Sequence, residues 1–579
     1  LMPIFNNILA GSSGQGDTGY DIDQSLRIEH ADGYLTKTFG SAGNRKTWTY
    51  SVWCKKALID NSMYWFASDY SDSTNLFIMN LRASNATASK DYTLSIQWRI
   101  SESTTRSLHT TQKFRDPSAW YHIVLVCDTT QASASDRLKL YVNGEQVTDF
   151  AIDDRSNISQ DADTAINRAA GHQIGAWNNT SGAGGYYAEV HFIDGTALTP
   201  ASFGETNSDT NQWQAIKYAG SYGTNGFYLK FQDSAALGDD SSGNTNDFTP
   251  TNLVATDQVL DSPTRNYCTL NPLAPPRASG SFTYSEGNLK VSMGGTGDAD
   301  CASTMGASSG KWYAEAYIVT GDQTTDTPFV GVVSSKFLDS ETIASSSNSL
   351  VYYYTGNKRL NGTVTSYGAT YNAGDIIGVA FNSDSNEVTF YKNNATQGAV
   401  SITADEYVFN SGRSGGTPVV VWNFGQDSSF AGETTAQGNG GVGEDFYYTP
   451  PTGYKALNTD NLDDPAIALP TDHFNTVLYS GNGGTNSITG TGFSPDLVWN
   501  KSRDGSSGHD IYDSVRGVEK SLASDETSAE VNRSTGLQSF DSDGFTTGDY
   551  IRSNYSGRIF VSWNWKAGGT AVSNTDGSL

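Results

Sequence analysis

The chain has 579 residues and a formal net charge of −26, and 37% of its residues are hydrophobic. A chain of this length divides into roughly three to four domains. The acidic balance without clustered Lys and Arg excludes nucleic acid as a partner, because phosphate binding needs such clusters. No run of about 18 apolar residues occurs, so we expect no membrane insertion. Sixty glycines and the lack of sustained helical periodicity favour an all-β chain of short strands and turns.

Residues 1–20 begin apolar and continue into a Gly/Ser-rich stretch (GSSGQG at 11–16). This segment is too short to fold alone and is typical of a flexible arm. Two interpretations stay open for it: a terminus without a partner, or a peptide that docks onto a larger assembly.

The region 21–232 contains several strongly predicted strands. Residues 120–128 (WYHIVLVCD) and 138–142 (LKLYV) are rich in β-branched and aromatic side chains, and the following Asn143-Gly144 pair predicts a hairpin turn. Residues 91–98 (DYTLSIQW) alternate apolar and polar side chains, which is typical of a half-buried antiparallel strand. The region is therefore predicted to be an antiparallel β-sandwich.

Together with residues 47–53 (TWTYSVW) and 185–195 (GYYAEVHFIDG), these motifs resemble the laminin-G/concanavalin-A-like lectin jelly roll. The resemblance implies a sandwich whose loops bind glycans or proteins, and only some such domains hydrolyse a substrate. Glucanases of this fold carry closely spaced carboxylates on one strand, and no such pattern occurs here. We therefore predict that the chain is not an enzyme.

A sugar-binding site needs amides for the hydroxyls and an aromatic face for the ring. Trp177, Asn178, Tyr186 and Tyr187 supply these residue types near predicted strand ends and are the candidate ligand-binding residues. A core position for Trp177 is the alternative.

In laminin-G relatives, aspartates and backbone carbonyls at one rim of the sandwich often hold calcium. The resemblance makes Asp128 and Asp194 the candidate Ca²⁺ ligands, with turn capping as the alternative. No spacing in the sequence specifies a metal site, and no other cofactor is predicted. Cys54 and Cys127 lie in apolar strands, where we expect small buried side chains, and His122 is expected to have a structural role.

A turn-rich connector spans residues 233–280, and a second sandwich is predicted for 281–432. Four motifs in this region are GKWYAEAY (310–317), GDIIGVAFN (374–382), EVTFYKNN (387–394) and VVVWNFG (419–425). Their order and spacing resemble the SPRY domain, which implies partner-binding loops and no catalysis. Asn394 stands where glycine is usual, and asparagine tolerates the left-handed conformation of the same turn.

Residues 433–470 contain Pro450 and Pro451 and are predicted to be a stiffened linker. A third β-rich domain is predicted for 471–579, with strands such as 559–565 (IFVSWNW). It resembles a C-terminal domain, of unknown biochemical role, that recurs in bacteriophage virion proteins. The sequence leaves open whether this domain continues after Leu579.

The series of domains, with phrases such as YGTNGFYL (222–229), resembles large structural proteins of marine podovirus-like phages. The resemblance implies a tail fibre, spike or capsid appendage, assembled in the host cytoplasm and located on the virion. Its expected partners are other virion proteins, bound by the N-terminal arm, and a host-surface glycan or protein. A homo-oligomer is expected, and trimers are common among such appendages. The alternatives are a non-binding decoration protein and a polysaccharide depolymerase with scattered catalytic residues.

Overall fold

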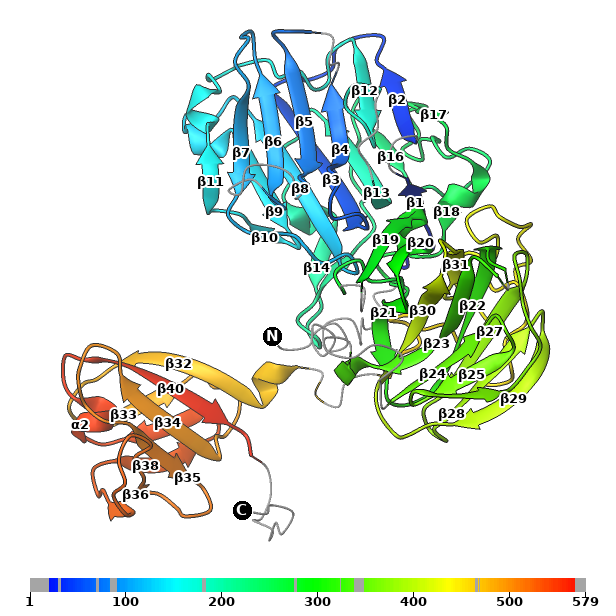
Figure 1. The fold of residues 1–579 in the computed structure, drawn as a ribbon. Coiled ribbons are helices and arrows are strands. Elements are labelled where there is room, and N and C mark those ends of the chain that lie inside the picture. The colour runs from blue at the N-terminus through cyan, green and yellow to red at the C-terminus, as the bar shows by residue number, and fades with distance from the viewer. Residues whose placement is uncertain are drawn as a thin grey trace. The chain divides into compact units, whose positions relative to one another are not determined.

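The computed structural model describes residues 20–29, 33–68, 72–83, 91–179, 184–274, 279–322, 324–337, 348–463, 467 and 469–567. Most regular elements in these residues are β-strands, so the predicted all-β fold is confirmed (Figure 1). The chain forms two compact units, Leu1–Ser208 with Gln212–Asp464, and Asp209–Asn211 with Pro465–Leu579. No helix in the described residues is long and apolar enough to cross a membrane. The predicted N-terminal arm lies outside the described residues except for Tyr20.

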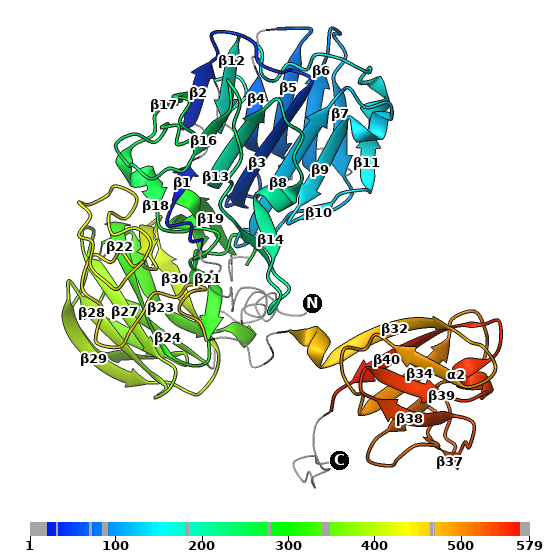
Figure 2. The ribbon, with the colours of Figure 1, turned by 180° about the vertical axis from the view of Figure 1, so that it is seen from behind.

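The first sandwich consists of two antiparallel sheets of eight strands each (Figures 1 and 2). The strands of one sheet are β1 (Ser25–Ile28), β3 (Thr47–Lys56), β8 (Trp120–Asp128), β9 (Leu138–Val142), β10 (Glu145–Gln146), β13 (Gly185–Asp194), β16 (Phe227–Leu229) and β18 (Gln258–Val259). Their order is β10-β9-β8-β3-β13-β1-β18, and β16 also pairs with β13.

The second sheet of this sandwich covers the other side of the core. Its strands are β2 (Tyr34–Thr38), β4 (Met63–Ser68), β5 (Leu76–Leu81), β6 (Leu94–Arg99), β7 (Arg106–Thr110), β11 (Phe150–Asp153), β12 (Gly171–Ile174) and β17 (Thr249–Thr251). Their order is β11-β7-β6-β5-β4-β12-β2-β17. A hairpin of β14 (Gly204–Thr206) and β15 (Trp213–Ala215) completes the domain.

Local sequence explains the strand pairing of the first sandwich. Asn143 and Gly144 have φ values of 47° and 83°, the combination that a type I′ turn needs, and they join β9 to β10 as predicted. The alternating residues Leu94, Ile96 and Trp98 of β6 all enter the core. Cysteines 54 and 127 are buried as expected.

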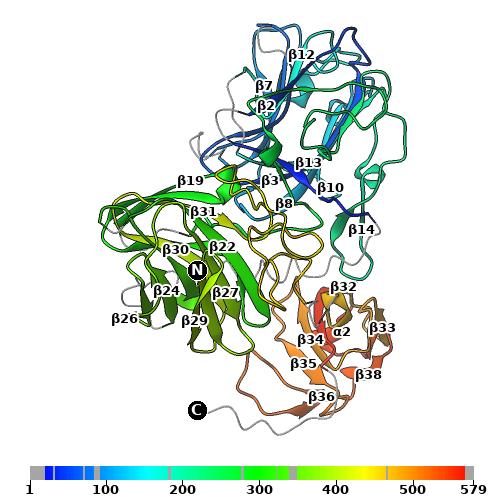
Figure 3. The same cartoon turned by 90° about the vertical axis from the view of Figure 1, so that its right-hand side faces the viewer.

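The second sandwich has a seven-stranded and a six-stranded antiparallel sheet. The first has the strands β19 (Ser279–Ser285), β20 (Lys290–Thr296), β22 (Lys311–Thr320), β27 (Ile376–Asn382), β28 (Glu387–Lys392), β29 (Ala395–Ser401) and β31 (Val419–Asn423). The second has β21 (Ala299–Ala307), β23 (Thr327–Ser334), β24 (Ser349–Tyr353), β25 (Asn357–Leu360), β26 (Thr363–Ser366) and β30 (Tyr407–Gly415). Their orders are β19-β20-β31-β22-β27-β28-β29 and β21-β30-β23-β24-β25-β26. Figure 3 shows β22 beside β27, which pairs with it over its whole length.

Two features of the second sandwich bear on the sequence predictions. Asn393 and Asn394, with φ values of 46° and 67°, form the turn between β28 and β29, so Asn394 does replace the usual glycine. The segment predicted as linker 433–470 is corrected in its first part, because Phe446, Ala456 and Leu457 are buried in the second sandwich. Residues 433–463 therefore form part of this domain, since their apolar side chains cover one side of its sheet.

Buried charged side chains connect the two sandwiches of the first unit, and we call this region the junction. Arg27 of β1 is 1% exposed and donates to Asp427 Oδ2 at 3.1 Å, and its Nη2 lies 3.4 Å from Glu286 Oε2. Lys55 of β3 and Asp261 are both fully buried, with Nζ 2.7 Å from Oδ2. Lone buried charges are costly, so each cation here is matched by a carboxylate.

The second unit is a smaller β-structure, as predicted for the third domain. One sheet has the order β32 (Phe474–Ser480), β40 (Ile559–Trp565), β34 (Leu497–Ser502), β35 (Asp510–Asp513). Another has the order β33 (Asn486–Thr489), β39 (Gly544–Thr547), β38 (Leu537–Asp541), and β36 (Lys520–Ser521) pairs with β37 (Val531–Asn532). The only α-helix in the described residues is the single turn α2 (Ile551–Asn554). The core between the sheets is small: Ile488, Val498, Tyr512, Leu537 and Phe545.

Candidate functional site

Trp177 and Asn178, two of the predicted ligand-binding residues, follow β12 and are half-buried. The Trp177 ring stacks on Tyr64, with 6.4 Å between the ring centroids and 25° between the planes. It packs against a small apolar cluster that includes Ala67 and Ile78 and is separate from the main core. Both residues keep partial exposure, and their contact with a ligand stays a prediction.

Tyr186 and Tyr187, the other two candidates, have no exposed surface. The Tyr186 hydroxyl donates to the carbonyl oxygen of Gly287 at 2.7 Å, and Lys55 Nζ lies 5.4 Å from the centre of its ring. The Tyr187 hydroxyl donates to the carbonyl oxygen of Tyr64 at 2.9 Å. The expectation for these two tyrosines is therefore corrected. Strand β13 is covered on both faces, by the first core and by the junction, so neither ring has a free face for a sugar.

Asp194, a candidate calcium ligand, ends β13 opposite Trp48. Its Oδ1 accepts hydrogen bonds from the Asn44 backbone N–H at 2.7 Å and from Asn167 Nδ2 at 2.6 Å. Its Oδ2 accepts the backbone N–H of Asn225 at 3.0 Å. This carboxylate ties three loops to the end of one strand, which is the turn-capping role.

Asp128, the other calcium candidate, ends β8 on the opposite side of β3. Its carboxylate accepts hydrogen bonds from the Thr130 hydroxyl at 2.6 Å and from Gln131 Nε2 at 2.5 Å. Partial burial raises the pKa of Asp128, but these hydrogen bonds outweigh it and the pKa is lowered. The described residues contain no group of three or more His, Cys, Asp or Glu side chains that could hold a metal ion. The geometry therefore assigns both aspartates to turn capping.

Ser51 and His122 form a pair with the residue types of a nucleophile and its base. His122 Nε2 lies 2.8 Å from Ser51 Oγ, and Trp213 Nε1 donates to His122 Nδ1 at 2.9 Å. Because Nδ1 accepts, the neutral ring carries its proton on Nε2 and donates it to the serine, which is the wrong direction for activating a nucleophile. Burial lowers the pKa of His122 to about 3, and Ser51 has no exposed surface. The pair is structural, as expected for His122.

A buried glutamate, which the sequence did not single out, lies at a bulge of β13. Glu189 has φ 48° and is 4% exposed. It accepts hydrogen bonds from the hydroxyls of Tyr20 and Tyr228, both at 2.6 Å, and lies 3.5 Å from His191 Nε2. Burial raises the pKa of Glu189. The contact with His191 and the two hydroxyl hydrogen bonds lower this pKa by more than burial raises it, so the net shift is downward. Its two hydrogen bonds with hydroxyl groups hold Tyr20 and β16 on the sheet.

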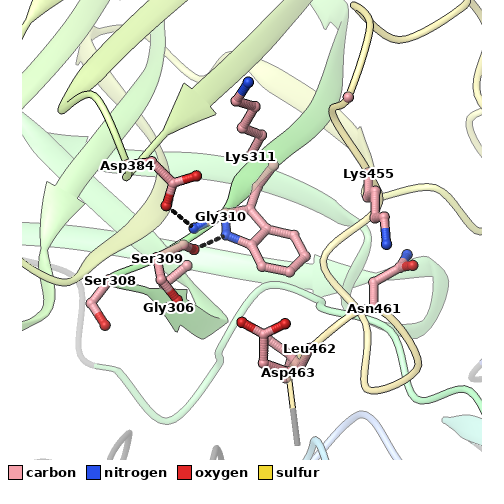
Figure 4. A pocket seen from close by; sticks show the side chains of 13 residues that line it. Gly306, Ser308, Ser309, Gly310, Lys311, Asp384, Lys455, Asn461, Leu462 and Asp463 are labelled. Carbon is pink, nitrogen blue, oxygen red and sulfur yellow. Dashed lines mark hydrogen bonds between the residues drawn. The ribbon is translucent and has the colours of Figure 1, made fainter.

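A pocket of about 470 Å³ opens on the second sandwich where β22 begins (Figure 4). Three separate segments line it: residues 306–312, Asp384, and parts of 453–463. The turn at its floor is fixed by two hydrogen bonds, from the Gly310 N–H to Asp384 Oδ1 and from Trp312 Nε1 to the Ser309 carbonyl, both at 2.7 Å. Trp312 is 5% exposed, so its ring contributes an edge to the floor.

The charged side chains of this pocket are balanced. Lys311, Lys455, Asp384 and Asp463 all line it and are all exposed. In Figure 4 the Lys455 side chain points toward Asn461, whereas Lys311 extends away from the other labelled side chains. Among the described residues, neither Lys455 nor Asp463 has an ion-pair partner for its side chain. The pocket thus offers donors and acceptors that the protein itself does not use.

Hydrogen bonds to β22 hold the pocket wall of residues 453–463 and the segment that leads into it. Buried Glu315 of β22 accepts the backbone N–H groups of Tyr447 and Tyr448, each at 2.8 Å. Burial raises the pKa of Glu315 to about 7 although these hydrogen bonds oppose the shift. Lys455 N–H also donates to the carbonyl oxygen of Lys311 at 3.1 Å. The pocket is therefore supported by fixed backbone rather than by a free loop.

Three segments of the chain match known families. Residues 29–203 match the concanavalin A-like lectin/glucanases superfamily, and residues 311–428 match the SPRY domain. Residues 469–579 match a domain of unknown function, DUF7483. The lectin-like and SPRY domains predicted from the sequence are thereby confirmed, and together they suggest a binding or adhesion module. No curated protein matches the chain.

Solved structures that resemble the chain cover single domains of it. The SPRY domain of human HERC1 is 19% identical, with a TM-score of 0.24, and the match covers 26% of this chain and 96% of that one. A native heptameric SAP-like pentraxin from Limulus polyphemus is 16% identical, with a TM-score of 0.22, over 31% of this chain and 80% of that one.

Proposed function

We propose that this chain is a structural virion protein of a bacteriophage, a tail fibre, spike or capsid appendage, and not an enzyme. It adheres to a glycan or protein of the host surface through its β-sandwich domains. Its N-terminal arm binds other virion proteins, and several copies assemble on the particle.

The observation that carries the binding role is the pocket on the second sandwich. Its charged side chains are exposed on a fold that recognises partners, and those of Lys455 and Asp463 have no ion-pair partner among the described residues. By contrast, the buried Ser51–His122 pair and Glu189 are fully used in holding the first sandwich together. The side chains that remain available to a ligand are therefore those of the surface pocket.

The pocket chemistry favours a neutral, hydroxyl-rich ligand. Two lysines and two aspartates line it, so its formal charge is zero in a chain of net charge −26. A hydroxyl group donates to a carboxylate and accepts from an ammonium group, so a neutral saccharide satisfies both kinds of side chain. A cationic ligand would be repelled by the two lysines, and an anionic ligand would be repelled by the two aspartates. We therefore take a neutral stretch of host-surface glycan as the ligand.

The test is binding of the purified full-length chain to host cells and to their envelope polysaccharide, with release of reducing ends measured in parallel. We expect saturable binding, no reducing-end release, and loss of at least about tenfold in affinity for Lys455→Met and Asp463→Asn. Lys217→Met, at an exposed lysine of the first sandwich, is the matched control and should bind as the wild type does.

Each other outcome has a definite meaning. Reducing-end release would establish a depolymerase and overturn the non-enzymatic role. Absence of binding to cells and polysaccharide would favour a decoration protein. Binding that is unchanged in both pocket variants would place the adhesive site elsewhere, with Trp177 as the next residue to substitute.

A further inference from the structure

The sheet β32-β40-β34-β35 of the second unit has apolar side chains on both of its faces. Its inward side mixes polar residues such as Asn500 and Asn564 with apolar ones such as Val498 and Phe560, and all four have no exposed surface. Alternate residues of the same strands point outward and are mostly apolar. The outward residues that matter here are Phe474, Leu478, Trp499, Ile559, Trp563 and Trp565, and we call this surface the C-terminal sheet face.

The strand register brings these residues into one continuous surface. Phe474 lies opposite Trp565, and Trp563 lies between Thr476 of β32 and Trp499 of β34. The three strands β32, β40 and β34 lie side by side in Figure 1. Because the outward side is mostly apolar and partly exposed, the hydrophobic effect favours covering it.

The exposed fractions show that the described residues of the second unit leave this face partly uncovered. Leu478 is 60% exposed, Ile559 40% and Phe474 38%. The strands β32, β40, β34 and β35 have 7, 7, 6 and 4 residues, and together they span roughly 390 Å², taking about 4.8 Å between strands and about 3.4 Å per residue. Pairing two such faces would bury roughly 800 Å² or more, which is in the range of weak, transient interfaces.

The arrangement of the aromatic rings argues against a sugar as the occupant. Trp499 and Trp563 pack edge to face, with ring centroids 5.4 Å apart and planes at 61°. Phe474 and Trp565 are tilted by 51° with centroids 4.9 Å apart. A sugar ring needs a flat aromatic face left free for it, whereas these rings already lean on one another. A close-packed apolar surface of this kind matches another protein surface.

The charge of the face favours a second copy of this chain as that protein. With −26 per chain, two copies repel one another over most of their surfaces. On the strands of this face the outward charges are Lys501 of β34 and Asp513 of the edge strand β35, and Asp513 is paired with Arg516 at 2.5 Å. A nearly neutral apolar patch is where two acidic chains approach at the least electrostatic cost.

We propose that the C-terminal sheet face binds the same face of a second copy, sheet on sheet, about a two-fold axis. Stacked sheets pack about 10 Å apart, a spacing that the outward tryptophans can fill. A contact of this type uses the same residues from both copies and closes at two. It goes beyond the proposed adhesive function, because it assigns assembly to the second unit, whereas the pocket belongs to the first unit.

The test is sedimentation velocity of the full-length chain over a concentration series from about 1 to about 100 µM, where an interface of this size should be half-dissociated. We expect a monomer–dimer equilibrium in the wild type. Leu478→Glu and Thr476→Glu should each weaken association at least tenfold, because each places two like charges within one interface. Thr476 is exposed and already polar, so its substitution leaves the fold of the monomer intact.

Val442→Glu is the control, since Val442 is fully exposed on the first unit and receives the same charge. This variant should associate as the wild type does. A wild type that stays monomeric throughout the series would overturn the proposal, and so would equal association of all three variants. Adhesion to host cells by a monomeric Thr476→Glu variant would separate this surface from the proposed function.

Discussion

Two lysines of the first unit show how differently the same side chain is used. Lys55 at the junction is fully buried, and its Nζ donates to Asp261 Oδ2 and Asn266 Oδ1, both at 2.7 Å. Lys455 at the pocket is exposed and has no ion-pair partner among the described residues. The comparison separates charges that hold two sandwiches together from charges that remain available to a ligand.

The largest expected effect comes from removing the buried lysine. Lys55→Met should lower the free energy of unfolding by about 3 to 5 kcal/mol, because it leaves the Asp261 carboxylate buried without its cation. The measurement is the urea denaturation midpoint of the full chain, followed by tryptophan fluorescence. The double variant Lys55→Met/Asp261→Asn should recover part of the loss, since the amide oxygen still accepts the Trp120 indole N–H. A loss below about 1 kcal/mol in the single variant would show that the junction charges contribute little.

A substitution at Gly287 tests how much the packing of the junction, as distinct from its charges, contributes to stability. A Cβ at this position would lie 2.1 Å from the Tyr186 hydroxyl, and the residue has φ 66°. We expect Gly287→Ala to cost about 2 to 3 kcal/mol, from overpacking together with backbone strain. Gly374→Ala is the matched control, because Gly374 has φ 89° with nothing within 4 Å of its Cβ. Equal midpoints for the two variants would mean that the junction yields easily at this point.

His122 of β8 makes the stability of the first sandwich depend on pH. Its pKa is about 3 in the folded chain against an ordinary value of 6.5, so the unfolded chain binds the extra proton below pH 6.5. The stability that the neutral ring provides is complete above pH 6.5 and is lost as the pH falls toward 3. The expected loss between pH 6.5 and pH 5 is about 2 kcal/mol.

The corresponding measurement compares denaturation midpoints at several pH values. His122→Gln should flatten the curve over this range, whereas His473→Gln, at an exposed histidine of the second unit, should leave its slope unchanged. An unaltered slope in the His122 variant would mean that other groups cause the acid sensitivity.

Much of the fold follows from local sequence, since it depends on nearest neighbours along the chain. The alternation in residues 91–98 predicts β6, and Asn143-Gly144 and Asn393-Asn394 predict two hairpin turns that the structure contains. The mistake about Tyr186 and Tyr187 has a physical origin. Strand β13 is buried on both faces. The near-continuous run of apolar residues in its sequence is typical of a strand buried in this way.

The candidate site could not be predicted because its parts are distant in sequence. The pocket brings Gly310, Asp384 and Lys455 together from three segments, and each residue alone has the appearance of an ordinary surface or turn residue. Of the three segments, the sequence singles out only the strand that contains Trp312, because this strand resembles the SPRY pattern. Likewise, the sequence contains the alternation of β40, but which of its faces points inward depends on the strands that pair with it.

The smallest expected effect on stability completes the comparison of the two lysines. Lys455→Met makes the same chemical change as Lys55→Met, yet it should shift the free energy of unfolding by no more than about 0.5 kcal/mol, because the exposed ammonium group loses no partner. The urea midpoint measures this directly, and Lys217→Met provides a second exposed lysine for reference. A loss near that of Lys55→Met would show that Lys455 holds the pocket wall in place. The weaker adhesion of Lys455→Met would then result from a displaced pocket wall, and it would no longer support ligand binding at the pocket.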